Sequence, residues 1–544
     1  MNLNFSGYPD ADLRERMIAE HLEIARCARS ATDAYWQKMR AYYDGTHETA
    51  RQTGAFLNAM ELPWRPCSVP DGFLHVESQI EADPPNFEFS AHTDGEAPWV
   101  RHRENLTRYV VQNEDMTAKN AENERRLHIC GSAVWKLSVR YDERSLPTVG
   151  IENPPLESVF PDPFGKTVDD CEYIACVYRM SAAKAARIFA DDLKNRGLTM
   201  EHLIRARHHL LDDPVGLDDT VEIVEYWFRQ PCDGEAVITR EGQDPITYAY
   251  RGGDIALSIL IEGTEVRYLP KFWTKVPCRQ FPFVIYNKIP SEHTIWGKSE
   301  LESIIPLIDA ADRQLLFAQL NTAFFANDIL VYEENAFAAD SYPENRPGAV
   351  WKLRPGMSDR VRRLGGLASD HIAHYEIAEK YRAMMKETIG NYDFMQGDSS
   401  TNVTTATGLA LLGDYASKRT KAKNICKKAG FERLYRLIDA LALEIFSAER
   451  LHSILRCDGV FCFEDYLREF GELPAFHTVI HVGDGLEHSR SFTVSALSEL
   501  CAMDLGPDRY PLIRAYISAL GIPEKAELLQ ALDRQFAGGD TSDG

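Results

Sequence analysis

The sequence has no apolar stretch of about 18 residues, which is the length that a helix needs to span a membrane. Its first residues, MNLNFSGYPDADLRERM, lack the positively charged segment and apolar run that together mark a secretory signal. We therefore expect no membrane contact and a cytoplasmic place of assembly.

Cysteine pairs with zinc-ligand spacing are also missing. There are eleven cysteines and none lies in a CxxC pair. Cys171 and Cys176, like Cys457 and Cys462, have four residues between them and no matching partners nearby. This odd, scattered set predicts reduced cysteines in a cytosolic protein.

The histidines do not form a metal-binding pattern either. His371 and His374 stand at the start of a predicted helix without a third ligand nearby. His477 and His481 share one face of a strand-like run, where residues four apart lie roughly 13 Å from each other. That distance is too great for one ion, so we expect no metal and no cofactor.

Common catalytic motifs are absent: the chain has no Walker A string, no GxSxG and no HExxH. Asp162, Asp169 and Asp170 could be interpreted as paired acids for acid–base catalysis. Pro161 and Pro163 make a rigid turn there, however, and no catalytic partner accompanies the acids. We therefore assign these acids to turn formation and do not expect an enzyme.

Positive charge is scarce. Sixty Lys and Arg residues face 82 Asp and Glu residues, which gives a net charge of −22. Tight nucleic-acid binding neutralises phosphates with Lys and Arg, so this balance argues against a surface built to grip nucleic acid. An acidic wall would still allow nucleic acid to slide past without sticking.

What is present is a pattern of helices and strands typical of an α+β protein of several domains. Helices are predicted at the N-terminus, and a β-rich part follows with a helical insertion near 181–211. Long helices then return, and the tail GGDTSDG is expected to be disordered. The predicted helices cover 10–60, 72–81, 99–128, 298–325, 370–389, 406–449 and 490–536, and the predicted strands cover 133–141, 148–152, 173–179, 221–228 and 246–250.

The stretch 277–335 is the most informative part of the chain. A β-type run over 281–286 ends in a turn, and an amphipathic helix follows with Pro306 inside it. Proline there should either kink the helix or mark its true start. A second β-type run over 329–332 comes directly after the helix.

Three strings resemble segments of the portal proteins of tailed double-stranded DNA phages. HVESQIEADPPNFEFSA at 75–91 is similar to a helix that ends in a proline turn before a strand. IENPPLESVFPDPFGKTVDDCEYIA at 151–175 is similar to the "P..VFPDP….D" stretch. WGKSELESIIPLIDAADRQ at 296–314 resembles the start of the portal stem helix, although Asp312 stands where asparagine is common.

This resemblance implies a portal fold with wing, stem, clip and crown regions: long helices, a mixed β wing domain and a small β clip. The wing would cover 1–297, with its β-rich part at 130–290. The implied order afterwards is a stem helix at 298–325, the clip at 326–369, a second stem helix at 370–389, a tunnel loop at 390–406, a long wing or crown helix at 407–455, a C-terminal wing or crown region at 456–536 and a disordered tail at 537–544.

The resemblance also implies candidate site residues. The polar tunnel loop would surround DNA, with hydroxyl and amide side chains making sequence-blind contacts to phosphates; a surface loop without this role is the alternative. A basic cluster in the clip would face DNA or a partner, or would simply be solvated. The loop residues are Gln396, Ser399, Ser400, Thr401, Asn402 and Thr404; the clip residues are Arg354, Arg360, Arg362 and Arg363; the stem packing residues are Leu301, Ile305, Ile308 and Leu315.

A portal of this kind is implied to be a homododecameric ring at one capsid vertex of the virion, assembled in the host cytoplasm. It would serve as the conduit for DNA packaging and genome ejection and as the head–tail connector. Its implied partners are double-stranded DNA, the terminase large subunit, the major capsid and scaffold proteins, and head–tail adaptor proteins. Two alternatives remain open: another structural virion protein, such as a minor head or adaptor protein, and an unrecognised nucleic-acid enzyme.

Overall fold

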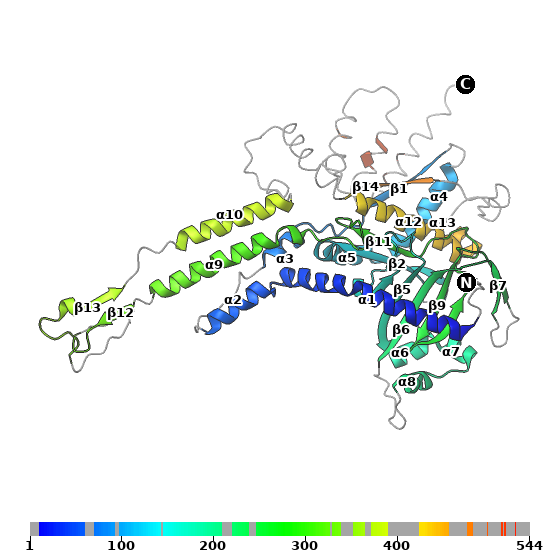
Figure 1. Cartoon of the computed structure of the whole chain (residues 1–544). Coiled ribbons are helices and arrows are strands. Elements are labelled where there is room, and N and C mark those ends of the chain that lie inside the picture. Colours follow the sequence, from blue (N-terminus) through cyan, green and yellow to red (C-terminus); the bar gives the residue numbers. More distant parts are fainter. Residues whose placement is uncertain are drawn as a thin grey trace, which may run out of the picture.

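The computed structural model describes residues 10–59, 70–92, 97–142, 145–208, 220–238, 246–326, 329–338, 352–364, 371–389, 424–455 and 476–481, with a few isolated residues after 497. Helices and antiparallel strands form a body, from which one long arm projects (Figure 1). This arrangement confirms the predicted α+β class.

The N-terminal helical region is broken where the local sequence provides caps. Helix α1 (Ala11–Asp44) ends at Gly45, whose φ of 69° is easily reached only without a side chain, and α2 (Glu48–Ala59) follows. Helix α3 spans Asp71–Glu77. The single helix predicted at 99–128 is two helices, α4 (Ala97–Asn113) and α5 (Met116–Cys130), because Asp115 caps α5 by accepting the Ala118 amide.

Two antiparallel sheets form the β-rich part of the body. One has the order β10–β9–β6–β5–β4 and the other β11–β2–β3. Strand β9 was not predicted because all seven of its residues are buried, so it shows no polar alternation. The bounds are β2 Ser132–Tyr141, β3 Pro147–Glu152, β4 Val159–Pro161, β5 Tyr173–Ser181, β6 Thr220–Arg229, β9 Ile255–Ile261, β10 Thr264–Leu269 and β11 Phe283–Asn287.

Smaller elements complete the body. Strand β7 (Gly234–Ile238) pairs with β8 (Ile246–Tyr250), and β1 (Asn86–Ala91) pairs with the distant β14 (Phe476–His481). The helical insertion after β5 is divided into three short helices. Their bounds are α6 Ala182–Ile188, α7 Ala190–Arg196 and α8 Met200–His208, and a 3₁₀ turn, η1, spans Leu156–Ser158.

Helix α12 (Ile425–Ile445) packs on the β11–β2–β3 sheet and carries much of the core. Gly430 permits the close approach, because a Cβ there would lie 2.8 Å from the Tyr286 Cβ. The helix predicted through residue 455 is interrupted: Phe446 is extended, with φ −76° and ψ 141°, and α13 (Ala448–Leu455) follows. Residues 407–423 of that predicted helix lie outside the described residues.

Candidate functional site: a two-helix arm and its tip

A two-helix arm is the most prominent feature outside the body. Helix α9 (Ile305–Ala326) runs outward from the body, and α10 (His371–Ile389) runs back beside it (Figure 1). A ribbon of β12 (Ile329–Tyr332) and β13 (Val361–Leu364) lies at the far end. At 1.5 Å per residue, the 22 residues of α9 extend about 33 Å.

The turn before α9 is fixed tightly to the body. Trp296 meets Trp36 edge to face, with ring centroids 5.0 Å apart. The Gly297 amide donates to the Ser132 hydroxyl at 2.8 Å, and a Cβ at Gly297 would lie only 2.5 Å from the Gly131 carbonyl oxygen. The Ser299 hydroxyl donates to the His128 carbonyl at 2.8 Å. The WGKS string therefore sets the direction in which the arm leaves the body.

The α-helix of the arm begins later than predicted. A 3₁₀ turn, η2 (Leu301–Ser303), comes first, and α9 starts at Ile305 rather than at 298. Pro306 therefore lies in the first turn of the helix, where its missing N–H costs no hydrogen bond. Of the two outcomes predicted for this proline, the structure shows that it marks the true start.

The four predicted stem packing residues divide into two groups. Leu301, Ile305 and Ile308 are buried in the core of the body, where they anchor the arm. Leu315 lies further along α9 and is half-buried. The first three are therefore attachment residues within one chain, and only Leu315 belongs to the projecting part.

A network of buried ionisable side chains lies under the base of the arm. His128 is 2% exposed; its Nδ1 lies 3.4 Å from a Glu300 carboxylate oxygen, and its Nε2 lies 3.9 Å from Glu124. Lys427, at the start of α12, contacts Glu124 at 3.0 Å and Glu81 at 2.8 Å. Burial lowers the pKa of His128. Burial would also lower the pKa of Lys427, but the two carboxylates outweigh it and raise that pKa.

The first helices hold the inner half of the arm from the side. His47 Nε2 lies 3.0 Å from the Asp312 carboxylate, and the Tyr42 hydroxyl donates to Asp309 at 3.3 Å. The Tyr42 and His47 rings stack at 4.3 Å. Asp312, the residue that departs from the family pattern, is thus used to fasten α9 to the segment between α1 and α2.

The arm exposes large apolar and aromatic side chains on both of its helices. His374 Nδ1 lies 2.7 Å from the Gln314 amide oxygen and links the two helices. Phe317 on α9 is 47% exposed, and Tyr375 and Met384 on α10 are 49% and 48% exposed. A helix that is apolar on nearly all sides normally packs against protein on all sides. In a single chain the arm leaves these groups in water.

The tip brings predicted basic residues together. In the antiparallel ribbon, Val331 pairs with Arg362 and Leu330 pairs with Arg363. The Arg354 amide donates to the Ala336 carbonyl at 3.1 Å, which joins the 352–357 segment to the ribbon. Arg354, Arg360 and Arg362 are exposed, and Arg360 pairs with Glu333. Sequence reasoning placed these arginines in one region, and the ribbon's strand pairing brings them to one end of the arm.

The predicted tunnel loop at 390–406, with Gln396, Ser399, Ser400, Thr401, Asn402 and Thr404, lies outside the described residues. Helix α10 returns to the body at Ile389, which is buried, directly before the loop. The described chain resumes at Asn424, eighteen residues after the predicted end of the loop.

The acids of the VFPDP turn act as predicted, in turn formation. Asp162 accepts the amides of Phe164 and Glu172 at 3.0 and 3.2 Å. Asp170 accepts the Thr167 hydroxyl at 2.8 Å, and Asp169 forms a two-pronged ion pair with Arg433 at 2.6 and 2.7 Å. All three carboxylates are therefore occupied by structural contacts.

Within the described residues, no group of three or more His, Cys, Asp or Glu side chains is placed to hold a metal ion. His477 lies on β14 four positions from His481, as the strand prediction required. Among the described helices, none is both long and apolar enough to cross a bilayer.

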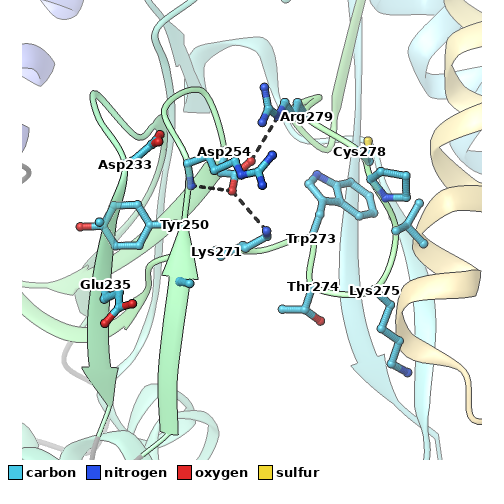
Figure 2. A pocket seen from close by; sticks show the side chains of 15 residues that line it. Asp233, Glu235, Tyr250, Asp254, Lys271, Trp273, Thr274, Lys275, Cys278 and Arg279 are labelled. Carbon is cyan, nitrogen blue, oxygen red and sulfur yellow. Dashed lines mark hydrogen bonds and ion pairs between the residues drawn. The ribbon is translucent and has the colours of Figure 1, made fainter. Parts of the chain in front are cut away.

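A cleft of about 940 Å³ lies between the β7–β8 hairpin and residues 271–279 (Figure 2). Its central carboxylate, Asp254, is shared by Lys271 and Arg279, each at 3.2 Å. On the wall towards α12, Glu444 accepts the amides of Lys275 and Val276 at 2.8 and 2.9 Å. Asp254 is thus held by ion pairs and Glu444 by backbone amides of the same chain.

The body and the projecting arm together define an α+β protein whose two-helix arm ends in a β ribbon. A family model described as phage P22-like portal protein matches residues 75–407. That match covers more than half of the 544 residues and includes all three strings that carry the resemblance. The chain belongs to the family of phage P22-like portal proteins and is thus a bacteriophage virion component of a structural, non-enzymatic family. A comparison with curated proteins finds no match.

Proposed function

We propose that twelve copies of the chain close into a ring at one capsid vertex and form the conduit for DNA packaging and ejection. In this ring α9 and α10 are the stem, and the β12–β13 ribbon with residues 326–369 is the clip. Residues 1–297 form the wing, and the C-terminal part from 407 onwards contributes to wing and crown.

The observation that supports a ring best is the exposed apolar surface of the arm. Phe317, Tyr375 and Met384 are each about half exposed in one chain. Burying such side chains contributes about 1.5–3 kcal/mol each, and parallel arms of neighbouring copies would provide that burial. Two acidic copies repel each other on average, so apolar contacts along the stem are what can hold them together.

The clip is the proposed docking site for the terminase large subunit and, after packaging, for head–tail adaptor proteins. Arg354 and Arg362 are exposed at the outer end of the arm, far from the core that holds the subunit together. Changing both to Glu should abolish docking of the terminase while leaving ring assembly intact. Lys184→Glu on α6, also an exposed change of charge, is the matched control. Unchanged terminase binding by the double variant would remove the clip assignment.

The tunnel loop is the proposed contact with moving DNA. Residues 390–406 contain hydroxyl and amide side chains and no lysine, so they would contact phosphates briefly and without sequence preference. Replacing 392–404 with a short Gly-Ser linker should leave assembly intact and impair packaging or retention of DNA. Normal packaging by that variant would argue against this role.

Assembly with scaffold and major capsid protein would place the ring in the virion. Negative-stain electron microscopy of the purified chain, with light scattering for mass, tests the central proposal. We expect rings with a central channel and a mass of about twelve times 61.6 kDa. A chain that stays monomeric or dimeric at high concentration, with and without scaffold protein, would contradict it.

A further inference from the structure

His47 lies in the short segment between α1 and α2 and faces the inner half of the arm. It is 5% exposed, and its ring stacks on that of Tyr42 with the centroids 4.3 Å apart. Its Nε2 atom lies 3.0 Å from the Asp312 carboxylate of α9 and 3.9 Å from the Asp309 carboxylate. Within the described chain, no residue hydrogen-bonds to the second ring nitrogen, Nδ1. The contacts of this imidazole with polar groups of the arm are therefore contacts with carboxylates.

The junction around His47 is rich in negative charge. The side chains of Asp312 and Asp309 are only 13% and 22% exposed. Burial raises the pKa of Asp71 on α3, and the charge of Asp312 adds to this effect. Arg382 of α10 lies on the same side of the arm, 3.0 Å from Asp71. Three carboxylates of α3 and α9 thus meet one arginine here, and a positive charge on the imidazole would reduce the imbalance.

Tyr42, the other polar side chain of α1 at this junction, does not change charge near neutral pH. Its hydroxyl donates to Asp309 at 3.3 Å. Burial, with the negative charge of Asp309, raises the pKa of Tyr42 to about 12. Histidine, in contrast, is the side chain that ordinarily changes charge between about pH 5 and 8. In this junction the imidazole is thus the group that can respond to the proton concentration near neutrality.

The charge of the imidazole decides how strongly it holds the arm. A neutral imidazole with its proton on Nε2 donates an ordinary hydrogen bond to Asp312, whereas an imidazolium forms a charge-assisted bond of about twice the strength. Burial disfavours the charged form, and the two carboxylates favour it. We infer that His47 is a proton-dependent clamp, which in its charged form holds α9 to the segment between α1 and α2 more firmly than in its neutral form.

The aspartate at position 312 is what makes this clamp depend on charge. Portal proteins commonly have asparagine at this position, and an asparagine would accept the same hydrogen bond without forming an ion pair. The response to pH is therefore a property of this chain. It lies within one subunit and goes beyond the proposed ring, so it can be measured on unassembled chains.

The test is a double-mutant cycle on the unassembled full-length chain. His47→Gln, which keeps a hydrogen-bond donor, Asp312→Asn and the double variant are compared with wild type in urea unfolding at pH 6.0 and 8.5. Effects of other titrating groups cancel in such a cycle. The coupling should multiply the unfolding constant about five-fold or more at pH 6.0 and nearly vanish at pH 8.5, because hydrogen bonds to charged groups are stronger than neutral ones. The matched control is the cycle of Tyr42→Phe with Asp309→Asn, whose coupling should change little between the two pH values.

Hydrogen exchange of the wild-type chain gives a second readout that does not depend on the folding of any variant. After correction for intrinsic exchange rates, amides of residues 309–315 should be protected several-fold better at pH 6.0 than at pH 8.5, relative to residues 431–442 of α12. Equal protection at both pH values, equal coupling at both, or a control cycle that changes as much would overturn the inference and make His47 a pH-independent packing residue. None of these results would affect the proposed ring.

Discussion

Lys427 provides the sharpest test of how the arm is held to the body. The Lys427 side chain is buried at the start of α12, 3.0 Å from Glu124 and 2.8 Å from Glu81. Glu124 is only 2% exposed, and it also faces His128, which in turn contacts Glu300 just before the arm. Replacing Lys427 with Met keeps the volume and leaves the Glu124 carboxylate without its cation.

The expected cost follows from this geometry. Two unit charges 3 Å apart attract by roughly 5–6 kcal/mol at an effective dielectric constant of about 20. The contact with Glu81 adds little, because that carboxylate is 46% exposed and screened by water. Desolvation offsets part of the attraction to Glu124, and removing one partner of a buried pair typically costs about 3–5 kcal/mol. We expect Lys427→Met to lower the free energy of unfolding by that amount at pH 8.

Urea unfolding followed by tryptophan fluorescence measures this cost. Trp135 suits the purpose, because its ring centroid lies 6.1 Å from that of Phe431 on α12. The double variant Lys427→Met with Glu124→Gln removes the stranded charge, so it should recover part of the loss.

Lys184→Met is the matched control, since this lysine is exposed on α6. Surface changes of this kind usually stay within about 0.5 kcal/mol. If Lys427→Met lowers the free energy of unfolding no more than the control does, or if adding Glu124→Gln lowers it further, this buried network of ionisable side chains does not stabilise the base of the arm.

Three further outcomes are expected. Burial, with Lys386 nearby, lowers the pKa of His75 to about 4. Between about pH 6.5 and pH 4 the unfolded chain therefore binds a proton at His75 that the folded chain does not bind. Up to about 3 kcal/mol of stability is lost as the pH falls through that window. His75→Phe should remove this part of the acid sensitivity in unfolding curves measured at pH 7 and 4.5, and identical pH slopes would contradict the assignment. Gly297→Ala should destabilise the chain by more than about 2 kcal/mol in urea unfolding, because the added Cβ would lie 2.5 Å from the Gly131 carbonyl oxygen. Gly252→Ala is the control, because it also lacks a left-handed φ and the nearest atom to its added Cβ lies at 3.6 Å. Raising NaCl from 50 to 500 mM should promote assembly in light scattering, because salt screens the repulsion between chains of charge −22; weaker assembly at high salt would indicate that ion pairs hold the ring together.

The sequence alone predicted those parts of the fold that local physical rules control. Strand-forming residue patterns predicted β2 and β6, whereas Pro306 left two outcomes open, a kink or the true start of the helix, and the structure decided for the start. The family resemblance carried by three short strings was confirmed. Strand β9 was missed because complete burial removes the alternation that distinguishes a strand.

The tertiary structure decided everything that depends on residues distant in the sequence. Lys427 belongs to a basic run at 418–428 whose lysines are expected to pair with acidic residues of neighbouring subunits, whereas folding places Lys427 between Glu81 and Glu124 of its own chain. Phe164, in the turn between β4 and β5, is 88% exposed, which its aromatic character does not indicate. Local propensity acts through neighbours in the chain, whereas burial and charge pairing are settled only when strands and helices far apart in the sequence come together.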